Sequence, residues 1–223
     1  MKKNLFRQTG VLYLLVIVSA GLSQGYVRGT LVVFGDPTAT ATQILAHPGL
    51  FRLGITLDLI AFILDAIISV LLYQLFQPYG KRLALISSTL RLIAHPAIGS
   101  LNLLNHYLAY HVLNGAGWLE VFDPAQLEAL AMLFMEAHRY GYLIAGGFFG
   151  LHCFPLGISI YRSDAIPKLI GGLLWGSGLG YLIETFGNFQ VPGYESHTAM
   201  IVGIAAAIGE VSFALYLLIK GRR

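Results

Sequence analysis

The stretch HRYGYLIAGGFFGLHC, His138 to Cys153, decides the fold class of this chain. It is apolar enough to lie in a membrane, yet it begins with one histidine and nearly ends with another. The rest of the chain has the same character, since 56% of its 223 residues are hydrophobic and only 11% are charged. An average soluble domain has about 25% charged residues. The composition therefore predicts an integral membrane protein.

Six apolar segments each reach the length needed to cross about 30 Å of hydrocarbon at about 1.5 Å per residue. Backbone groups cannot stay unpaired in lipid, so we expect every segment to be helical. The expected spans are residues 8–27, 50–76, 83–113, 138–161, 169–189 and 198–219, each with approximate ends. The start, MKKNLFRQTG, resembles the charged beginning of a signal peptide. The apolar run after it is long enough to span, and we expect it to be retained.

Basic residues occur at every second connection between these segments, a pattern that sets the orientation of membrane proteins. They are Lys2, Lys3 and Arg7 before the first span, Lys81 and Arg82 between the second and third, Arg162 and Lys168 between the fourth and fifth, and Lys220, Arg222 and Arg223 at the end. The alternation predicts a multi-pass protein of the cell inner membrane with both termini in the cytoplasm. The fold prediction is a single all-α domain over residues 1–223: a six-helix transmembrane bundle with short external amphipathic helices.

Two longer connections lie on the predicted external side, and each carries a helix-start signal. Asp36 is followed by Pro37, with a stop at Pro48, and Asp123 is followed by Pro124. Aspartate is a preferred N-cap, and proline fits the first helical position. We expect the second of these helices to lie at the membrane interface and to run into the fourth span.

Ionisable residues inside the spans are costly and usually mark a site or an internal ion pair. Counting residues from the predicted span ends sorts them into two layers. The inner layer, nearer the cytoplasm, contains Asp65, Arg91, His95, His152 and Glu210. The outer layer contains Asp58, His106, His138 and Glu184. We predict that Arg91 pairs with Asp65 or Glu210, because an unpaired arginine at this depth is too costly.

Helical spacing agrees with this sorting. His95 and His106 are about three turns apart, and His138 and His152 about four turns apart, so each pair is nearly in phase. The third and fourth spans are antiparallel. His106 can therefore approach His138, and His95 can approach His152, which makes His95 and His152 the candidate metal ligands. The alternative is that these groups only form an ion-pair network that fixes helix register.

Glycine and proline add two further expectations. Gly146, Gly150, Gly172, Gly176 and Gly180 recur at four-residue spacing, which indicates seams of close helix packing, or space for a cavity beside the polar layers. Pro96 follows His95 and should kink the third span at the inner layer.

Several segments resemble a known family: FRLGITLDLIAFILDA, HRYGYLIAGGFFGLHC, GYLIETFGNF and AAIGEVSFALYLLIKG. They are similar to the bacterial multi-pass membrane family catalogued as domain of unknown function 4386, and the likeness covers nearly the whole chain. The resemblance implies a six-span membrane protein. It implies no activity and no catalytic residue.

Three functions stay open on the sequence. The first is a polar cavity within the membrane that binds or handles a small molecule or a metal through histidine and carboxylate side chains. The second is a small-molecule or proton-coupled transporter, although no inverted repeat is evident. The third is a non-catalytic assembly subunit. Whether the protein is an enzyme and which cofactor it holds are left open.

The expected partner is the lipid bilayer, with a small-molecule ligand and a homo-oligomer left open. Basic clusters with interleaved aromatic residues do not occur, so we expect no nucleic acid. The one cysteine, Cys153, excludes an internal disulfide and any CxxC metal motif.

Overall fold

The computed structural model describes residues 2–115 and 117–220, and all regular secondary structure within these ranges is helical. Arg222 and Arg223, which belong to the predicted basic C-terminus, lie outside the described residues. The main helices are α1 (Lys2–Gly21), α2 (Gly29–Leu31), α3 (Pro37–Ala46), α4 (Pro48–Phe76), α5 (Lys81–Leu92), α6 (Ser100–Leu113), α7 (Pro124–Tyr161), α8 (Lys168–Gln190) and α9 (Glu195–Lys220). Short 3₁₀ turns cover Gln77–Tyr79 and Gly117–Leu119.

Within the described residues, five helical stretches are long and apolar enough to cross a membrane. They are Lys3–Leu31, Pro48–Tyr79, Pro124–Tyr161, Lys168–Gln190 and Glu195–Lys220. The expected third span is not among them by composition, although its residues are helical without a break from Lys81 to Leu113. The polar residues Arg91, Asn102 and His106 lower the mean hydropathy of this segment. All three are buried inside the bundle.

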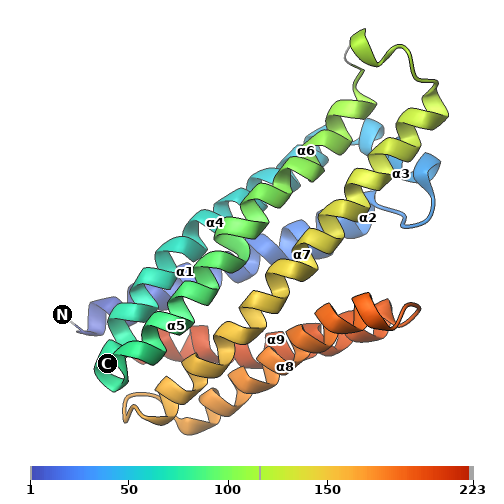
Figure 1. Cartoon of the computed structure of the whole chain (residues 1–223). Coiled ribbons are helices and arrows are strands. Elements are labelled where there is room, and N and C mark those ends of the chain that lie inside the picture. Colours follow the sequence, from blue (N-terminus) through green and yellow to red (C-terminus); the bar gives the residue numbers. More distant parts are fainter. Residues whose placement is uncertain (1, 116, 221–223) are drawn as a thin grey trace.

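The helices are nearly aligned along one long axis, and the N- and C-termini lie at the same end (Figure 1). Helices α4, α5–α6 and α7 run together over most of that length. The α8–α9 hairpin packs against α7 at the end where the termini lie and diverges from it toward the opposite end (Figure 1). Helix α1 contacts both α4 and α9, and so connects the two groups.

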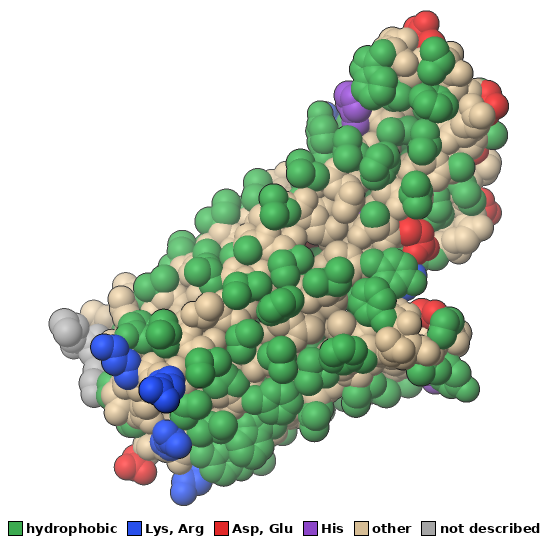
Figure 2. All heavy atoms as spheres, viewed as in Figure 1, with side chains coloured by type: hydrophobic (Ala, Val, Ile, Leu, Met, Phe, Trp, Pro, Cys, Tyr) green, Lys and Arg blue, Asp and Glu red, His purple; other side chains and the backbone are tan. Residues whose placement is uncertain are grey.

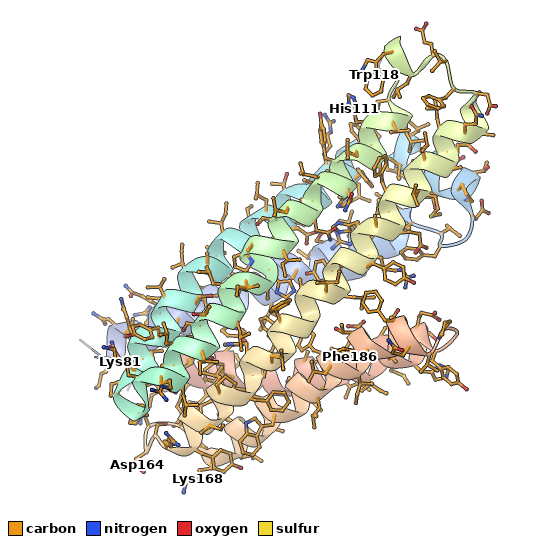
Figure 3. The ribbon with its side chains drawn as sticks, in the orientation of Figure 1. Lys81, His111, Trp118, Asp164, Lys168 and Phe186 are labelled. Atoms are coloured by element: carbon orange, nitrogen blue, oxygen red, sulfur yellow. The ribbon has the colours of Figure 1, made fainter. Side chains whose placement is uncertain are left out.

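The two ends of the molecule differ in charge. Lys81, Asp164 and Lys168 lie at the end where the termini are found, whereas His111 and Trp118 lie at the other end (Figure 3). Lys and Arg side chains gather at the first end on the face shown in Figure 2, and acidic side chains lie at the second. We call the first the basic end.

Both predicted helix starts are confirmed. The Asp36 carboxylate accepts from the backbone N–H of Ala39 at 2.9 Å, and Asp123 forms a capping box with Gln126. The second helix is continuous with the expected fourth span. It forms a single helix of 38 residues, α7, because nothing between Pro124 and His138 interrupts its backbone hydrogen bonds.

Two stretches of π-helix interrupt the regular α-helices, at Leu22–Arg28 and at Ile93–Gly99. The second contains His95 and Pro96, so the expected distortion of the third span lies where Pro96 removes a backbone donor. The first was not expected. It carries the helix beyond Val27, where the first span was expected to end, and brings Arg28 into the interior.

The predicted glycine seams are confirmed in part. A Cβ on Gly150 would meet the carbonyl oxygen of Gly178 at 2.9 Å, so these two glycines set the close approach of α7 and α8. Gly180 packs against α9, where a Cβ would meet Ala205 at 3.1 Å. Gly176 borders open space, so it takes no part in a seam.

The distribution of apolar and charged side chains differs from that of a soluble protein. Large apolar side chains such as Val70, Leu104 and Ile204 are exposed, while Asp58, Asp65 and Arg91 are each at most 1% exposed. Apolar side chains cover much of the flank of the bundle in Figure 2. This arrangement is expected for helices that face lipid and hold their charges inside the bundle.

Candidate functional site

The predicted ion pair of the inner layer is confirmed. The Arg91 Nε donates to Asp65 Oδ1 at 2.8 Å, and a second guanidinium N–H donates to the same oxygen. Both side chains are buried. A lone arginine at this depth would be costly, and the pair lowers that cost.

Arg91 also holds His152. Its Nη1 lies 3.2 Å from His152 Nε2 and 2.9 Å from the Tyr13 hydroxyl. The His152 Nδ1 lies 2.9 Å from the carbonyl oxygen of Ser87. Because the carbonyl accepts, the proton of this imidazole is on Nδ1, and Nε2 accepts from Arg91. The prediction that His152 faces the bundle interior is confirmed.

Glu210 completes this group through two tyrosines. Tyr13 lies 3.2 Å from Glu210 Oε2, and Tyr181 donates to Oε1 at 2.8 Å. We call the following residues the inner cluster: Tyr13, Asp65, Ser87, Arg91, His152, Tyr181 and Glu210. It joins six helices, α1, α4, α5, α7, α8 and α9, in one hydrogen-bonded network. Its tyrosines and Ser87 were missed by sequence reasoning, because nothing in a single sequence separates them from other residues of the apolar runs.

His95 lies beside the inner cluster, with its Nδ1 4.0 Å from Asp65 Oδ2. No hydrogen bond or ring contact between His95 and His152 is described, so their predicted approach stays a prediction. The Phe149 ring packs against both imidazoles, with centroids 5.2 Å from His95 and 5.4 Å from His152. The two imidazoles thus share one aromatic neighbour, and the metal pair predicted for them stays a prediction.

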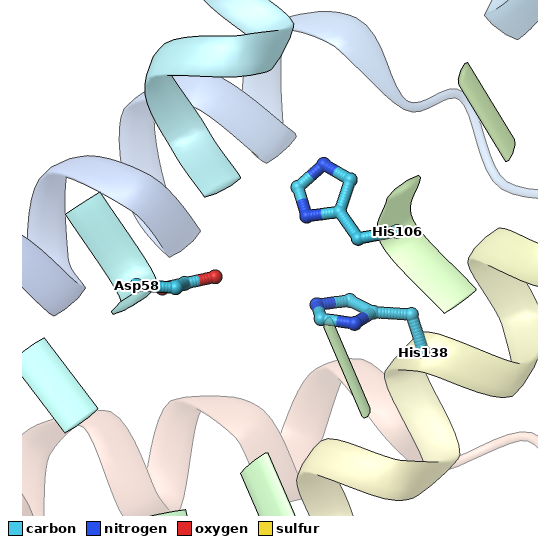
Figure 4. Close-up of side chains that lie close together, drawn as sticks. All are labelled: Asp58, His106 and His138. Atoms are coloured by element: carbon cyan, nitrogen blue, oxygen red, sulfur yellow. The ribbon is translucent and has the colours of Figure 1, made fainter. Parts of the chain in front are cut away.

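The predicted approach of His106 to His138 is confirmed, with ring centroids 4.9 Å apart. Asp58 completes a group of three. One potential ligand atom from each of these side chains lies within 4.8 Å of the others, and all three are buried. Figure 4 shows the two imidazoles and the carboxylate converging on one space. Together with Arg28 we call them the outer cluster.

Arg28 is the residue of this cluster that the sequence did not reveal. Its Nη1 donates to Asp58 Oδ2 at 2.6 Å and lies 3.4 Å from His106 Nδ1. Its Nε donates to the side-chain oxygen of Gln24 at 2.8 Å. The expected span ended one residue before Arg28, which placed it in an external loop; the π-helical turn keeps it inside.

The outer cluster is incompletely hydrogen-bonded. His138 and Asn102 form a reciprocal pair, in which Asn102 donates to the backbone oxygen of His138 at 2.7 Å and His138 Nδ1 donates to the backbone oxygen of Asn102 at 3.2 Å. Among the described residues, the Nε2 atoms of His106 and His138 have no hydrogen-bond partner. Asn102 also lies so close to α7 that a Cβ on Gly141 would collide with it.

Glu184, the last predicted site residue, lies apart from both clusters at the mouth between α7 and the α8–α9 hairpin. It shares the lining of this mouth with Arg139 and Asn188. The Arg139 guanidinium pairs with Glu136 at 3.0 Å and donates to the Asn188 side chain at 3.2 Å. Figure 2 shows a notch between the end of the hairpin and the neighbouring arm of the molecule.

Two adjoining cavities connect this mouth with the clusters. The outer cavity, of about 350 Å³, includes Arg28, His138 and Glu184 in its lining. The inner cavity, of about 400 Å³, includes Asp65, Arg91 and Glu210. Their shared lining residues are Gln24, His95, Tyr142 and Tyr181. His152 is not part of either lining, but it contacts Arg91 and Phe149, which line the inner cavity.

This geometry defines a class of protein. It is a helical bundle whose apolar helices are long enough to cross a membrane and which buries two clusters of ionisable side chains. The chain belongs to the family described as domain of unknown function 4386, which matches residues 8–221. It is also 30% identical over 161 residues to an uncharacterised protein of Archaeoglobus fulgidus, covering 72% of this chain and 79% of that protein. The likeness thus extends to an archaeal protein. No solved structure matches.

Proposed function

We propose that this chain is a membrane-embedded binding protein whose two adjoining cavities take a small amphipathic molecule. The observation that carries this proposal is the lining of the inner cavity. Its walls include apolar side chains such as Val16, Ile17 and Phe62, while Asp65 and Glu210 supply charged groups. Ligand sites are typically apolar pockets with a few convergent polar groups of this kind.

The polar groups of the cavity indicate the chemistry of the ligand. Asp65 Oδ2 is a buried acceptor, and Gln24 Nε2 a buried donor, without a partner among the described residues. Unpaired buried polar atoms are costly, and a ligand that supplies the missing hydrogen bonds removes that cost. Two carboxylates and one guanidinium line the inner cavity, so we expect a head group that carries a positive charge and donates hydrogen bonds.

The proposed membrane topology has six spans and cytoplasmic termini in an inner membrane. Its support is the unbroken helix from Lys81 to Leu113 and the position of Lys81 and Lys168 at the same end as the termini. Single cysteines in a Cys153→Ala background test it. A membrane-impermeant thiol reagent applied to intact cells should label Thr42→Cys and spare Lys81→Cys, both at exposed positions. The reverse pattern would overturn this topology.

The same topology opens the cavities toward the outer side. A core of buried apolar residues closes the basic end beneath the inner cluster, with Ile68, Leu72, Leu156, Ile160, Leu174 and Phe213 among its members. A site open at one end suits binding. Transport is the second candidate, favoured by the shared lining of the two cavities, and it requires this core to part.

Native mass spectrometry of the protein, extracted from membranes in mild detergent, tests the binding proposal. We expect a bound small molecule in the wild type and its loss in Ala206→Phe, which fills the inner cavity. Ile208→Phe is the matched control, because it adds the same ring to an exposed position on the same helix. A bound molecule that survives Ala206→Phe, or none in any preparation, would argue against the proposal.

Thermal unfolding with added probes tests the expected head group. A medium-chain alkylamine should raise the unfolding temperature more than the alkanoate of equal length, and Asp65→Asn should abolish the difference. Proteoliposomes then separate the candidates. Uptake of the bound molecule by wild type, lost in Asp65→Asn, would favour transport over binding alone.

A further inference from the structure

The outer cluster holds two buried imidazoles with unused nitrogens beside a carboxylate. His106 and His138 are at most 2% exposed, and neither Nε2 atom has a partner among the described residues. The Nδ1 of His138 donates to the backbone oxygen of Asn102, so its Nε2 carries a lone pair. A buried lone pair without a donor is costly and is explained most simply by a ligand that the cluster is built to receive.

We propose that Asp58, His106 and His138 form a binding site for a divalent transition metal of the zinc class. This site goes beyond the small-molecule binding proposed above. Two imidazoles and one carboxylate are a ligand set for such metals, and three protein ligands leave a position open for water or another ligand. The ligand atoms lie within 4.8 Å of one another, so side-chain shifts of a few tenths of an ångström would bring all three to the coordination distance of about 2.0–2.2 Å from one ion.

The surroundings supply the orientation that metal-binding histidines need. Such histidines usually donate their second ring N–H to a backbone carbonyl or a carboxylate, which fixes the ring. His138 does this through Asn102. His106 is held by the Phe51 ring, edge to face with centroids 4.3 Å apart. Gly141 permits the close approach of Asn102 to α7 on which the first contact depends.

Arg28 explains how the site can also exist without metal. Its guanidinium contacts both Asp58 and His106 and neutralises the carboxylate. A guanidinium and a metal dication would repel each other at this distance in the low dielectric of the bundle. Arg28 also lines the outer cavity, which gives its side chain a space to enter. In this proposal, Arg28 and the metal compete for the same carboxylate.

The competition makes Arg28→Met the most informative variant. Zinc binding would be measured on detergent-solubilised protein carrying an affinity tag without histidine, by isothermal titration and by metal content after gel filtration. We expect one zinc ion per chain in the wild type. Arg28→Met should bind zinc at least about tenfold more tightly, because the repelling cation is gone.

Loss of a ligand should act in the opposite direction. Changing a group that only supports a metal ligand costs about 10- to 100-fold in affinity. We therefore expect His138→Gln and Asp58→Asn to weaken zinc binding by at least about 100-fold. His197→Ala is the matched control, because His197 is exposed and should leave binding unchanged. Replacing zinc by cobalt(II) should give an absorption spectrum that the same two variants lose.

Gel filtration and the unfolding temperature show which variants are folded. If a single variant does not fold, the double variant Arg28→Met/His138→Gln replaces it in the comparison of zinc binding. Two results would overturn the metal site: zinc retained by the folded double variant, or no zinc bound by Arg28→Met. Neither bears on the cavity ligand, because Ala206→Phe should remove that molecule and leave zinc binding intact.

Discussion

The inner and outer clusters use the same kinds of side chain and differ in how completely they are paired. In the inner cluster, Arg91 donates to Asp65 and Tyr13 and both nitrogens of His152 are engaged, and one carboxylate oxygen, Asp65 Oδ2, has no partner among the described residues. In the outer cluster, two imidazole nitrogens are buried without partners. The inner network is the more nearly complete of the two, which favours a structural role for its ion pair, whereas the open imidazole nitrogens of the outer cluster favour a site that receives a metal.

The two clusters also differ in what surrounds them. The apolar core at the basic end lies directly beneath the inner cluster, and Tyr13 belongs to both. The outer cluster borders a cavity through Arg28 and His138. The comparison teaches that the layer with the more elaborate network is the less promising place for a metal, although its Asp65 and Glu210 line the inner cavity. Four predictions test it, beginning with the largest expected effect.

Breaking the inner ion pair should have the largest effect. Arg91→Met leaves the Asp65 carboxylate buried without its cation, which typically costs about 3–5 kcal/mol of stability. The loss should appear as a large fall in the unfolding temperature and in the yield of folded protein. In the double variant Asp65→Leu/Arg91→Met both charges are gone, and most of the stability should return. A double variant as unstable as the single one would contradict the structural role of the pair.

The glycine seam that holds α8 against α7 should come next. Gly178→Ala places a Cβ 2.8 Å from the carbonyl oxygen of Gly150, and such overpacking costs about 1–3 kcal/mol. Gly176→Ala on the same helix meets open space, so it should be neutral or slightly stabilising. Thermal unfolding of the two variants side by side measures the difference. Equal effects would show that the seam does not limit the packing.

Replacing one histidine in each cluster compares the clusters directly. His152→Phe leaves the Arg91 N–H and the Ser87 hydroxyl without their imidazole partner, and we expect a loss of about 1–3 kcal/mol. His106→Phe removes an Nε2 that has no partner and an Nδ1 that makes only a long contact, 3.4 Å, with Arg28, which keeps its bonds to Asp58, so the loss should be smaller, about 1 kcal/mol. A greater loss for His106→Phe, measured in metal-free buffer, would reverse the assignment of the two clusters.

The smallest effect should come from the start of α7. Asp123→Ala removes the capping box at Gln126, and loss of such a cap costs about 1 kcal/mol. The effect should be confined to the end opposite the basic end, where hydrogen exchange of the first turn of α7 should quicken while that around His152 stays unchanged. Asp164→Ala, at an exposed residue outside the helices, serves as the control.

Composition and spacing predicted much of this molecule. Apolar runs long enough to span gave the helices, and Asp36 and Asp123 marked two helix starts. Counting residues along the spans placed Asp65, Arg91, His152 and Glu210 at one depth, and the structure connects all four through Arg91 and Tyr13. The approach of His106 to His138 also followed from helical phase, because an antiparallel pair brings residues of equal depth together.

The errors have physical reasons. Helical phase gives the face of a helix but not the side chain that fills the space in front of it, so the Phe149 ring that contacts both His95 and His152 was not foreseen. Arg28 was missed because a π-helical turn depends on tertiary packing that one sequence does not encode visibly.

The π-helical turn at Leu22–Arg28 also bears on how the family is to be aligned. A π-helical turn of this kind is equivalent to a single residue inserted into an α-helix. Deleting one residue there would turn the remainder of the helix by about 100° and direct the side chain at position 28 away from Asp58. A relative with a one-residue gap at this point should therefore be unable to present a guanidinium to the outer cluster. Relatives without the gap should be able to do so.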